Sequence, residues 1–184
     1  LDLPFLGLAT QNPIDQEGTY PLPEAQRDRF MMKLNISYPS KEEELKIMQR
    51  MSDLNFKNSV KTILTKKDIN SIQNEINKIS ISESIEKYII ELVNATRQPD
   101  SIGLEDLKNY ISFGASPRAS INLSLASKAN AFLSSRDYVM PDDVKEVAND
   151  VLNHRIILNY EAEAEGIKSE FIISKILEKV EINS

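Results

Sequence analysis

The chain has 184 residues, of which 41% are hydrophobic and 27% are charged, and its formal net charge is −6. This length allows one or two compact domains, and the composition is that of an ordinary globular protein. The acidic balance argues against a dedicated nucleic-acid-binding protein, which usually carries a basic surface. The chain has no cysteine and a single histidine, His154, which excludes disulfide bonds and zinc sites built from Cys and His.

No apolar run approaches the ~20 residues that cross a bilayer, so we predict no membrane span. The first residues also lack the basic start of a signal peptide. We therefore expect a cytoplasmic protein. Because the chain begins with Leu1 rather than Met, we also expect it to be a fragment.

The first 38 residues predict strand, helix and strand in that order. Residues 5–10 are a short apolar run between prolines, which is typical of a buried strand in a parallel sheet. Residues 11–22 are rich in turn signals. Pro23 favours a short helix as far as about residue 29. Residues 32–36 then alternate between apolar and polar, which predicts a second strand.

From residue 39 onward the pattern becomes helical. Ser40 and Thr65 each begin a capping box, with an acidic residue three positions later, and residues 53–64 indicate a linker between the two helices. Apolar stripes at helical spacing follow, and their members are Ile69, Ile72 and Ile76; Ile85, Ile89, Leu92 and Val93; Leu104, Leu107 and Ile111; Ile121, Leu125, Ala129 and Phe132; Val144, Val147, Ala148, Val151 and Leu152; and Phe171, Ile172, Ile176, Leu177 and Val180. Each stripe needs burial, so these helices should pack into one bundle.

Two strands are too few for an independent α/β domain. The predicted fold class is therefore an α/β fragment, containing the last strands of a parallel sheet, followed by an all-α bundle.

Three places in the chain are candidates for ligand chemistry. Asn12 follows the first predicted strand, where ligands of open α/β sheets bind and where it could orient a water or a phosphate oxygen. Position alone favours a turn-capping role instead. Arg27 and Arg29 precede the second predicted strand, and an arginine supplied by a neighbouring subunit can stabilise a transferring phosphoryl group. The alternative for both is a surface ion pair with Asp28 or Glu24.

The third candidate is Arg118, in the run GASPR at residues 114–118. Ser116 is a good N-cap, which places Arg118 in the first turn of a helix. A cation there opposes the helix dipole, and a bound anion would offset that cost. Arg118 could equally extend into solvent or pair with an acidic residue. His154 lies at a predicted helix end, where we expect a structural role.

The chain has no phosphate-binding loop of the form GxxxxGK[ST] and no apolar strand ending in the Asp-Glu pair that would hold magnesium. The run LATQNPIDQEGTYPLPEAQ at residues 8–26, followed by Asp28-Arg29-Phe30, closely resembles the MoxR-type AAA+ ATPases. Further matching runs are GASPR at 114–118, Tyr138-Val139 with Pro141-Asp142-Asp143-Val144, His154-Arg155-Ile156 and EAEAEG at 161–166. The resemblance covers almost the whole chain and is weaker over residues 41–100.

The resemblance implies a role for each candidate residue. Asn12 would be sensor 1, Arg29 the arginine finger that reaches the next subunit, and Arg118 sensor 2 on the helical lid. Position 27 is commonly apolar in this family but is Arg27 here, which leaves open which arginine acts across the interface; we choose Arg29 because it aligns with the Asp-Arg-Phe run. Met140 stands where a capping Ser or Thr is frequent.

The resemblance also divides the chain into the C-terminal portion of the AAA+ nucleotide-binding core at residues 1–38, a connecting helix and linker at 39–64, and the lid at 65–184. It implies an intact parent that binds ATP and Mg²⁺, forms a homo-oligomeric ring, expected to be a hexamer, and remodels client proteins, often with von Willebrand factor A domain partners. Without its own phosphate-binding loop and magnesium-binding acids, this chain is expected to bind no nucleotide firmly and to be inactive alone. The alternative function is a non-enzymatic helical interaction module.

Overall fold

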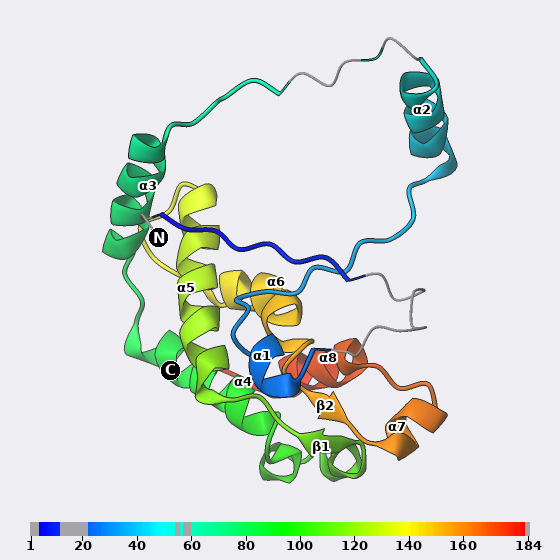
Figure 1. Ribbon diagram of the computed structural model, residues 1–184. Coiled ribbons are helices and arrows are strands. Elements are labelled where there is room, and N and C mark those ends of the chain that lie inside the picture. Colours follow the sequence, from blue (N-terminus) through cyan, green and yellow to red (C-terminus); the bar gives the residue numbers. More distant parts are fainter. Residues whose placement is uncertain (1–3, 12–21, 54–55, 57–59, 183–184) are drawn as a thin grey trace.

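The computed structural model describes residues 4–11, 22–53, 56 and 60–182, and the chain is mostly helical in these ranges. The elements, shown in Figure 1, are α1 (Glu24–Arg27), α2 (Lys41–Met51), α3 (Lys66–Lys78), α4 (Glu83–Ala95), the 3-10 helices η1 (Pro99–Ile102) and η2 (Glu105–Asn109), β1 (Ile111–Phe113), α5 (Pro117–Leu133), α6 (Pro141–Leu152), β2 (Ile157–Leu158), α7 (Tyr160–Ala164) and α8 (Ser169–Lys179). None of the helices in the described ranges is long and apolar enough to cross a bilayer.

Residues 66–182 form the helical bundle, whose single core lies mainly between α4, α5, α6 and α8. Leu92, Leu123, Val144 and Ile172 come from these four helices and are completely buried. The stripes predicted for α4 and α6 are confirmed, because every member is buried. Burial of such side chains contributes about 1.5–3 kcal/mol each, which makes this core the main source of stability in the described part of the chain.

The face predicted for α5 is wrong. Ile121 and Leu125 are 59% and 44% exposed, and the core-facing side chains are instead Ala119, Leu123 and Ala126. Small and apolar residues surround this helix on all sides, so periodicity could not select a face. The alanines allow α5 to lie close to its neighbour α6, because short side chains reduce the distance between helix axes.

The short helix predicted around residues 104–111 is also different in the structure. It is the 3-10 helix η2, followed by β1, which pairs antiparallel with β2 so that Ile111 lies opposite Leu158. This small sheet was not predicted, because three-residue and two-residue strands are too short to show a period-two pattern.

The strands predicted at residues 5–10 and 32–36 are not formed. Both segments lack strand pairing in the described ranges, and Phe5, Leu8 and Ile36 are 63%, 86% and 94% exposed. Strands of a parallel sheet need hydrogen-bonding neighbours and helices on both faces. The described residues of this chain supply neither to these segments.

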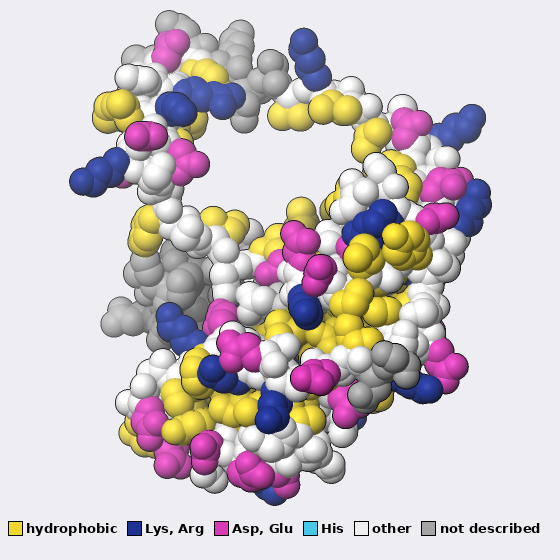
Figure 2. Space-filling view, turned by 180° about the vertical axis from the view of Figure 1, so that it is seen from behind, with side chains coloured by type: hydrophobic (Ala, Val, Ile, Leu, Met, Phe, Trp, Pro, Cys, Tyr) yellow, Lys and Arg dark blue, Asp and Glu magenta, His cyan; other side chains and the backbone are white. Residues whose placement is uncertain are grey.

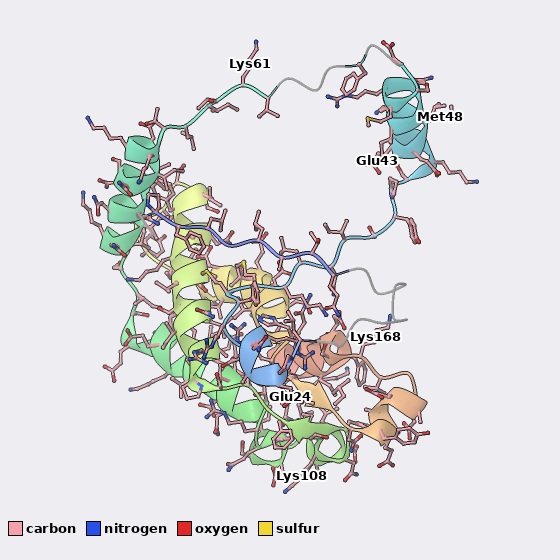
Figure 3. All side chains as sticks on the ribbon, in the orientation of Figure 1. Glu24, Glu43, Met48, Lys61, Lys108 and Lys168 are labelled. Carbon is pink, nitrogen blue, oxygen red and sulfur yellow. The ribbon has the colours of Figure 1, made fainter. Side chains whose placement is uncertain are left out.

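Helix α2 stands apart from the bundle (Figure 1). Both predicted capping boxes are present: the amide of Ser40 donates to Glu43 Oε2 at 2.8 Å, and that of Thr65 to Asp68 Oδ2 at 2.8 Å. No residue of α2 is buried, and the side chains of Glu43 and Met48 extend into open surroundings (Figure 3). Figure 2 shows an opening between the segment that carries α2 and the bundle.

Candidate functional site

The structure describes two of the three predicted site residues. Asn12 lies outside the described residues. Arg29 lies in the turn that follows α1, and Arg118 lies in the first turn of α5; both side chains are exposed. The two arginines are far apart in the sequence, and the carboxylate of Asp28, the residue before Arg29, pairs with Arg118.

The loop before α5 is fixed by close backbone contact with the end of α4. A Cβ atom on Gly114 would lie 2.4 Å from the carbonyl oxygen of Thr96, so only glycine fits at this position. The Thr96 hydroxyl accepts a hydrogen bond from the Ala115 amide at 2.9 Å, and Arg97 Nε donates to the Ala115 carbonyl at 2.6 Å. These contacts set the position and direction of the N-terminus of α5.

Ser116 and Arg118 both bind the carboxylate of Asp28. Ser116 is the N-cap of α5 and accepts a hydrogen bond from the Arg118 amide at 3.2 Å. Its hydroxyl donates to the Asp28 carboxylate at 2.9 Å, and Arg118 Nη1 donates to Asp28 Oδ2 at 3.1 Å. Of the alternatives open for Arg118, the structure therefore shows pairing with an acidic residue. The carboxylate also offsets the cost of placing a cation at a helix N-terminus.

Arg155 approaches Asp28 from the other side. Its side chain is completely buried, and its Nε donates to Asp28 Oδ1 at 3.1 Å. Its remaining nitrogens donate to backbone carbonyls: those of Asp28 at 3.1 Å, Phe30 at 2.5 Å and Met31 at 3.2 Å, and also that of Val151. A guanidinium has five donors in a planar fork, and here they join the peptide after α1 to the end of α6.

The ionisation of this pair follows from its surroundings. Burial disfavours the charge of Asp28, but hydrogen bonds from Ser116 and Arg118 and the charge of Arg155 outweigh it and lower the pKa of the carboxyl. Burial lowers the pKa of Arg155, and the Asp28 carboxylate opposes that shift. A guanidinium remains protonated under such conditions, so the contact is a true ion pair.

The single histidine, His154, lies beside this network and has a structural position. His154 is 6% exposed, and its Nε2 lies 3.1 Å from the carbonyl oxygen of Phe30. A carbonyl can only accept, so Nε2 carries the proton. Burial, together with the charge of Arg155, lowers the pKa of His154 to about 4. Beside it, Asn153 Nδ2 donates to the Lys33 carbonyl at 3.2 Å, and the Lys33 amide donates to the Asp150 carbonyl at 2.9 Å.

The two neighbouring arginines of α1 and its following turn differ in their surroundings. Arg27 is half-buried, and its Nε is buried without a hydrogen-bond partner among the described residues. Arg29 is exposed, and within the described ranges its side chain forms no ion pair. The alternative for Arg29, a surface ion pair with Asp28 or Glu24, is not formed within the described ranges. Asp28 is engaged by Arg118 and Arg155 instead.

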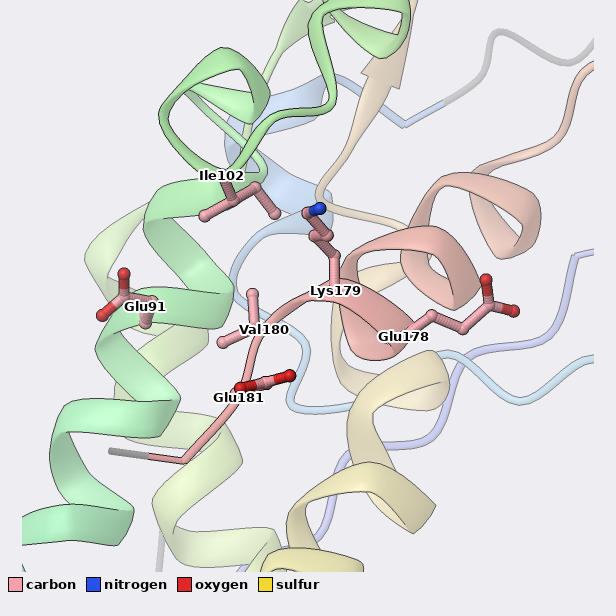
Figure 4. A pocket seen from close by; sticks show the side chains of 6 residues that line it. All are labelled: Glu91, Ile102, Glu178, Lys179, Val180 and Glu181. Atoms are coloured by element: carbon pink, nitrogen blue, oxygen red, sulfur yellow. The ribbon is translucent and has the colours of Figure 1, made fainter. Parts of the chain in front are cut away.

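The described residues around Asp28 supply cations and hydrogen-bond donors, but no cluster of carboxylates that could hold a metal ion. No group of three or more His, Asp or Glu side chains that could hold a metal ion occurs in the described ranges. A shallow pocket between α4 and the end of α8 (Figure 4) has an acidic lining, which does not suit a phosphate; the residues are Glu91, Ile102, Glu178, Lys179, Val180 and Glu181. It contains neither Arg29 nor Arg118.

Two residues of this site were not identified from the sequence. Asp28 was considered only as a local ion-pair partner, and Arg155 only as part of a run shared with a family. They are 127 positions apart, and no local pattern predicts that they meet. The one available signal was the placement of a cation, Arg118, at a helix N-terminus, which calls for an anion nearby.

Known proteins resemble the chain over almost its whole length. A family model described as the AAA lid domain matches residues 105–176, and one described as ATPase family associated with various cellular activities (AAA) matches residues 1–32. The chaperone MoxR1 of Mycobacterium tuberculosis is 45% identical over 177 residues, which are 96% of this chain and 46% of that protein. The uncharacterized protein YeaC of Bacillus subtilis is 42% identical over 179 residues, which are 97% of this chain and 53% of that protein.

A solved structure gives the same assignment. A crystal structure of a protein from Cytophaga hutchinsonii, described as an ATPase, matches with a TM-score of 0.94 and 62% identity, and covers 100% of this chain and 56% of that one. The likeness over the whole chain confirms the predicted fold class. The chain spans about half the length of the curated relatives it matches. With the lid match, the AAA match and the MoxR relatives together, the chain belongs to the MoxR-type AAA+ ATPases, as the C-terminal part of their core followed by the helical lid.

Proposed function

We propose that the full-length protein hydrolyses ATP in a cytoplasmic homo-oligomeric ring, expected to be a hexamer, and uses the cycle to remodel client proteins. Family membership supports the ATPase part, and a relative named as a chaperone supports the remodelling part. ATP with Mg²⁺ is the proposed ligand. Clients or partners with von Willebrand factor A domains belong to the same proposal.

Within that cycle, the described residues of this chain contribute positive charge and hydrogen-bond donors. Arg118 at the start of α5 would contact the phosphates of its own subunit's nucleotide as sensor 2, exchanging its Asp28 partner for them. Asn12 would orient the attacking water as sensor 1. Arg29 would stabilise the charge that develops on the phosphoryl group in the neighbouring subunit.

The observation that carries the proposal is the state of Arg29. Its side chain is exposed and has no ion-pair partner in the described ranges. The neighbouring residue Asp28, by contrast, is paired with both Arg118 and Arg155. A permanently charged fork on the surface is suited to reach another molecule. Arg27 is less suited, because its guanidinium is partly buried.

The test is ATP turnover by the full-length protein with Arg29→Ala. Loss of an arginine finger should lower turnover by about 10³-fold. Mixing this variant with one whose phosphate-binding loop is inactivated should restore activity, because each supplies what the other lacks. Arg27→Ala is the matched control and should keep turnover near the unmodified level. Unchanged turnover in Arg29→Ala would remove the finger assignment. Absence of ATP turnover in the unmodified full-length protein would favour the non-enzymatic interaction module.

A further inference from the structure

The peptide that carries Arg29 is bound to the helical bundle on both sides of that residue. Before it, the carboxylate and the carbonyl of Asp28 accept hydrogen bonds from Arg155. After it, the carbonyls of Phe30 and Met31 accept from the same guanidinium. We call residues 28–33 the finger segment.

The finger segment has a further attachment at its far end. Lys33 is joined through both of its backbone groups, to Asn153 and to Asp150, and His154 contacts the carbonyl of Phe30. All these partners lie at the C-terminal end of α6 or just beyond it. The finger segment is therefore attached to the bundle, although by its position in the sequence it belongs to the nucleotide-binding core.

Asp28 is the residue that ties this attachment to the start of α5. Its side chain is only 18% exposed and binds Ser116, Arg118 and Arg155 together. Arg155 is completely buried, so removing the Asp28 charge would leave a buried cation without its counter-ion, which is strongly unfavourable. Asp28 is the acidic side chain that pairs with Arg155 within the described ranges.

We propose that Asp28 and Arg155 clamp the finger segment to the helical lid, which makes Asp28 a positioning residue for Arg29. A movement of the lid within one subunit then moves the arginine that acts on the nucleotide of the next subunit. This inference rests on the proposed function, because it assigns Arg29 a trans-acting role. The clamp adds a mechanical link, through which lid movement at one nucleotide site affects the nucleotide site of the next subunit.

The clamp also explains why an exposed arginine can act precisely. Arg29 itself has no described ion-pair partner, so its direction depends on its backbone. A displacement of about 1 Å in a group that positions charge can lower a rate by about 100-fold. Fixing the peptide before and after Arg29 keeps the guanidinium within that tolerance while leaving its side chain free to meet the nucleotide.

The test uses full-length protein with Asp28→Asn, a nearly isosteric change that removes the charge. Turnover should fall by about 100-fold. Mixing Asp28→Asn with the variant whose phosphate-binding loop is inactivated should restore turnover. The Asp28→Asn subunits supply intact nucleotide sites, and the other variant supplies a correctly held Arg29. Asp28→Glu, which keeps the charge, should retain more activity than Asp28→Asn.

Asp143→Asn is the matched control, because Asp143 is also a buried carboxylate, paired with Arg136 at 2.5 Å, but its described hydrogen bonds and ion pair do not involve the finger segment. It should keep turnover within a few-fold of the unmodified protein and show no response to mixing. Unchanged turnover in Asp28→Asn would overturn the inference. A loss that mixing fails to restore would also overturn it, because the effect of Asp28 would then be confined to its own subunit.

A second measurement separates this inference from the proposed function. Hydrogen exchange of the Lys33 amide, which donates to Asp150, should become faster in Asp28→Asn and stay slow in Asp143→Asn. If the unmodified full-length protein does not hydrolyse ATP, the proposed function fails, and the exchange rate alone decides the clamp. Unchanged protection of Lys33 in Asp28→Asn would overturn the clamp, whatever the turnover.

Discussion

The helical bundle and the segment that carries α2 use their apolar residues in opposite ways. In the bundle, side chains such as Leu123 and Val144 are fully buried in one shared core. In α2, Leu45, Ile47 and Met48 are 49%, 51% and 59% exposed, and no residue is buried. The bundle is therefore stabilised by its own packing, whereas the contacts described for α2 are its cap, its internal hydrogen bonds and the stacking of Arg50 on Phe56.

Where the front of the chain does meet the bundle, the contact is mostly polar. The finger segment is held by hydrogen bonds and one shielded ion pair, and Met32 is its one described side chain that packs against the core. Polar junctions of this kind are directional, so they fix an orientation more than they add stability. The comparison thus separates three regions: a self-stabilised bundle, a polar junction and an unpacked helix.

The largest expected difference lies between two leucines. Leu123→Ala removes a completely buried side chain from the core and should lower the free energy of unfolding by about 3 kcal/mol. Leu45→Ala makes the same chemical change on exposed α2 and should alter it by less than about 0.5 kcal/mol. Denaturant unfolding followed by circular dichroism measures both. Equal losses would mean that α2 packs against the bundle in solution.

The polar junction should show a pH dependence that the other regions lack. The pKa of His154 is lowered to about 4 in the folded chain, from an ordinary value near 6.5. As pH falls below about 6.5, the unfolded chain binds the proton first, so stability is lost until pH reaches about 4. The loss should be about 2 kcal/mol by pH 5.

Denaturant midpoints between pH 7 and pH 5 measure this effect. His154 is the only histidine, and carboxylates titrate mainly below this window, so the slope belongs to one group. His154→Gln is the control and should remove the slope, even if it lowers stability at every pH. A slope that persists in His154→Gln would assign the pH dependence to another group.

The same three regions differ in how much of their structure could be predicted from the sequence. The capping boxes at Ser40 and Thr65 and the stripes of α4 and α6 are local patterns, and they were predicted correctly. The segments 5–10 and 32–36 have the apolar pattern of strands. They do not form strands, because the described residues supply no neighbouring strand with which they could pair. The face of α5 failed because small residues surround that helix. The junction between Asp28 and Arg155 was not reachable, because only the folded chain brings such distant positions together.

The smallest expected effect concerns the helix caps. Ser40 caps α2 and Ser82 caps α4, each accepting a hydrogen bond from an amide three residues later. Ser82→Ala should lower the free energy of unfolding of the bundle by about 1 kcal/mol, because α4 contributes to the core. Ser40→Ala should leave that value unchanged and reduce only the helix content of α2, since an isolated helix of this length is marginal in water. Amide exchange within α2 and the denaturant midpoint separate the two outcomes. A lower midpoint in Ser40→Ala would show that α2 unfolds together with the bundle, and the distinction between the two regions would then be wrong.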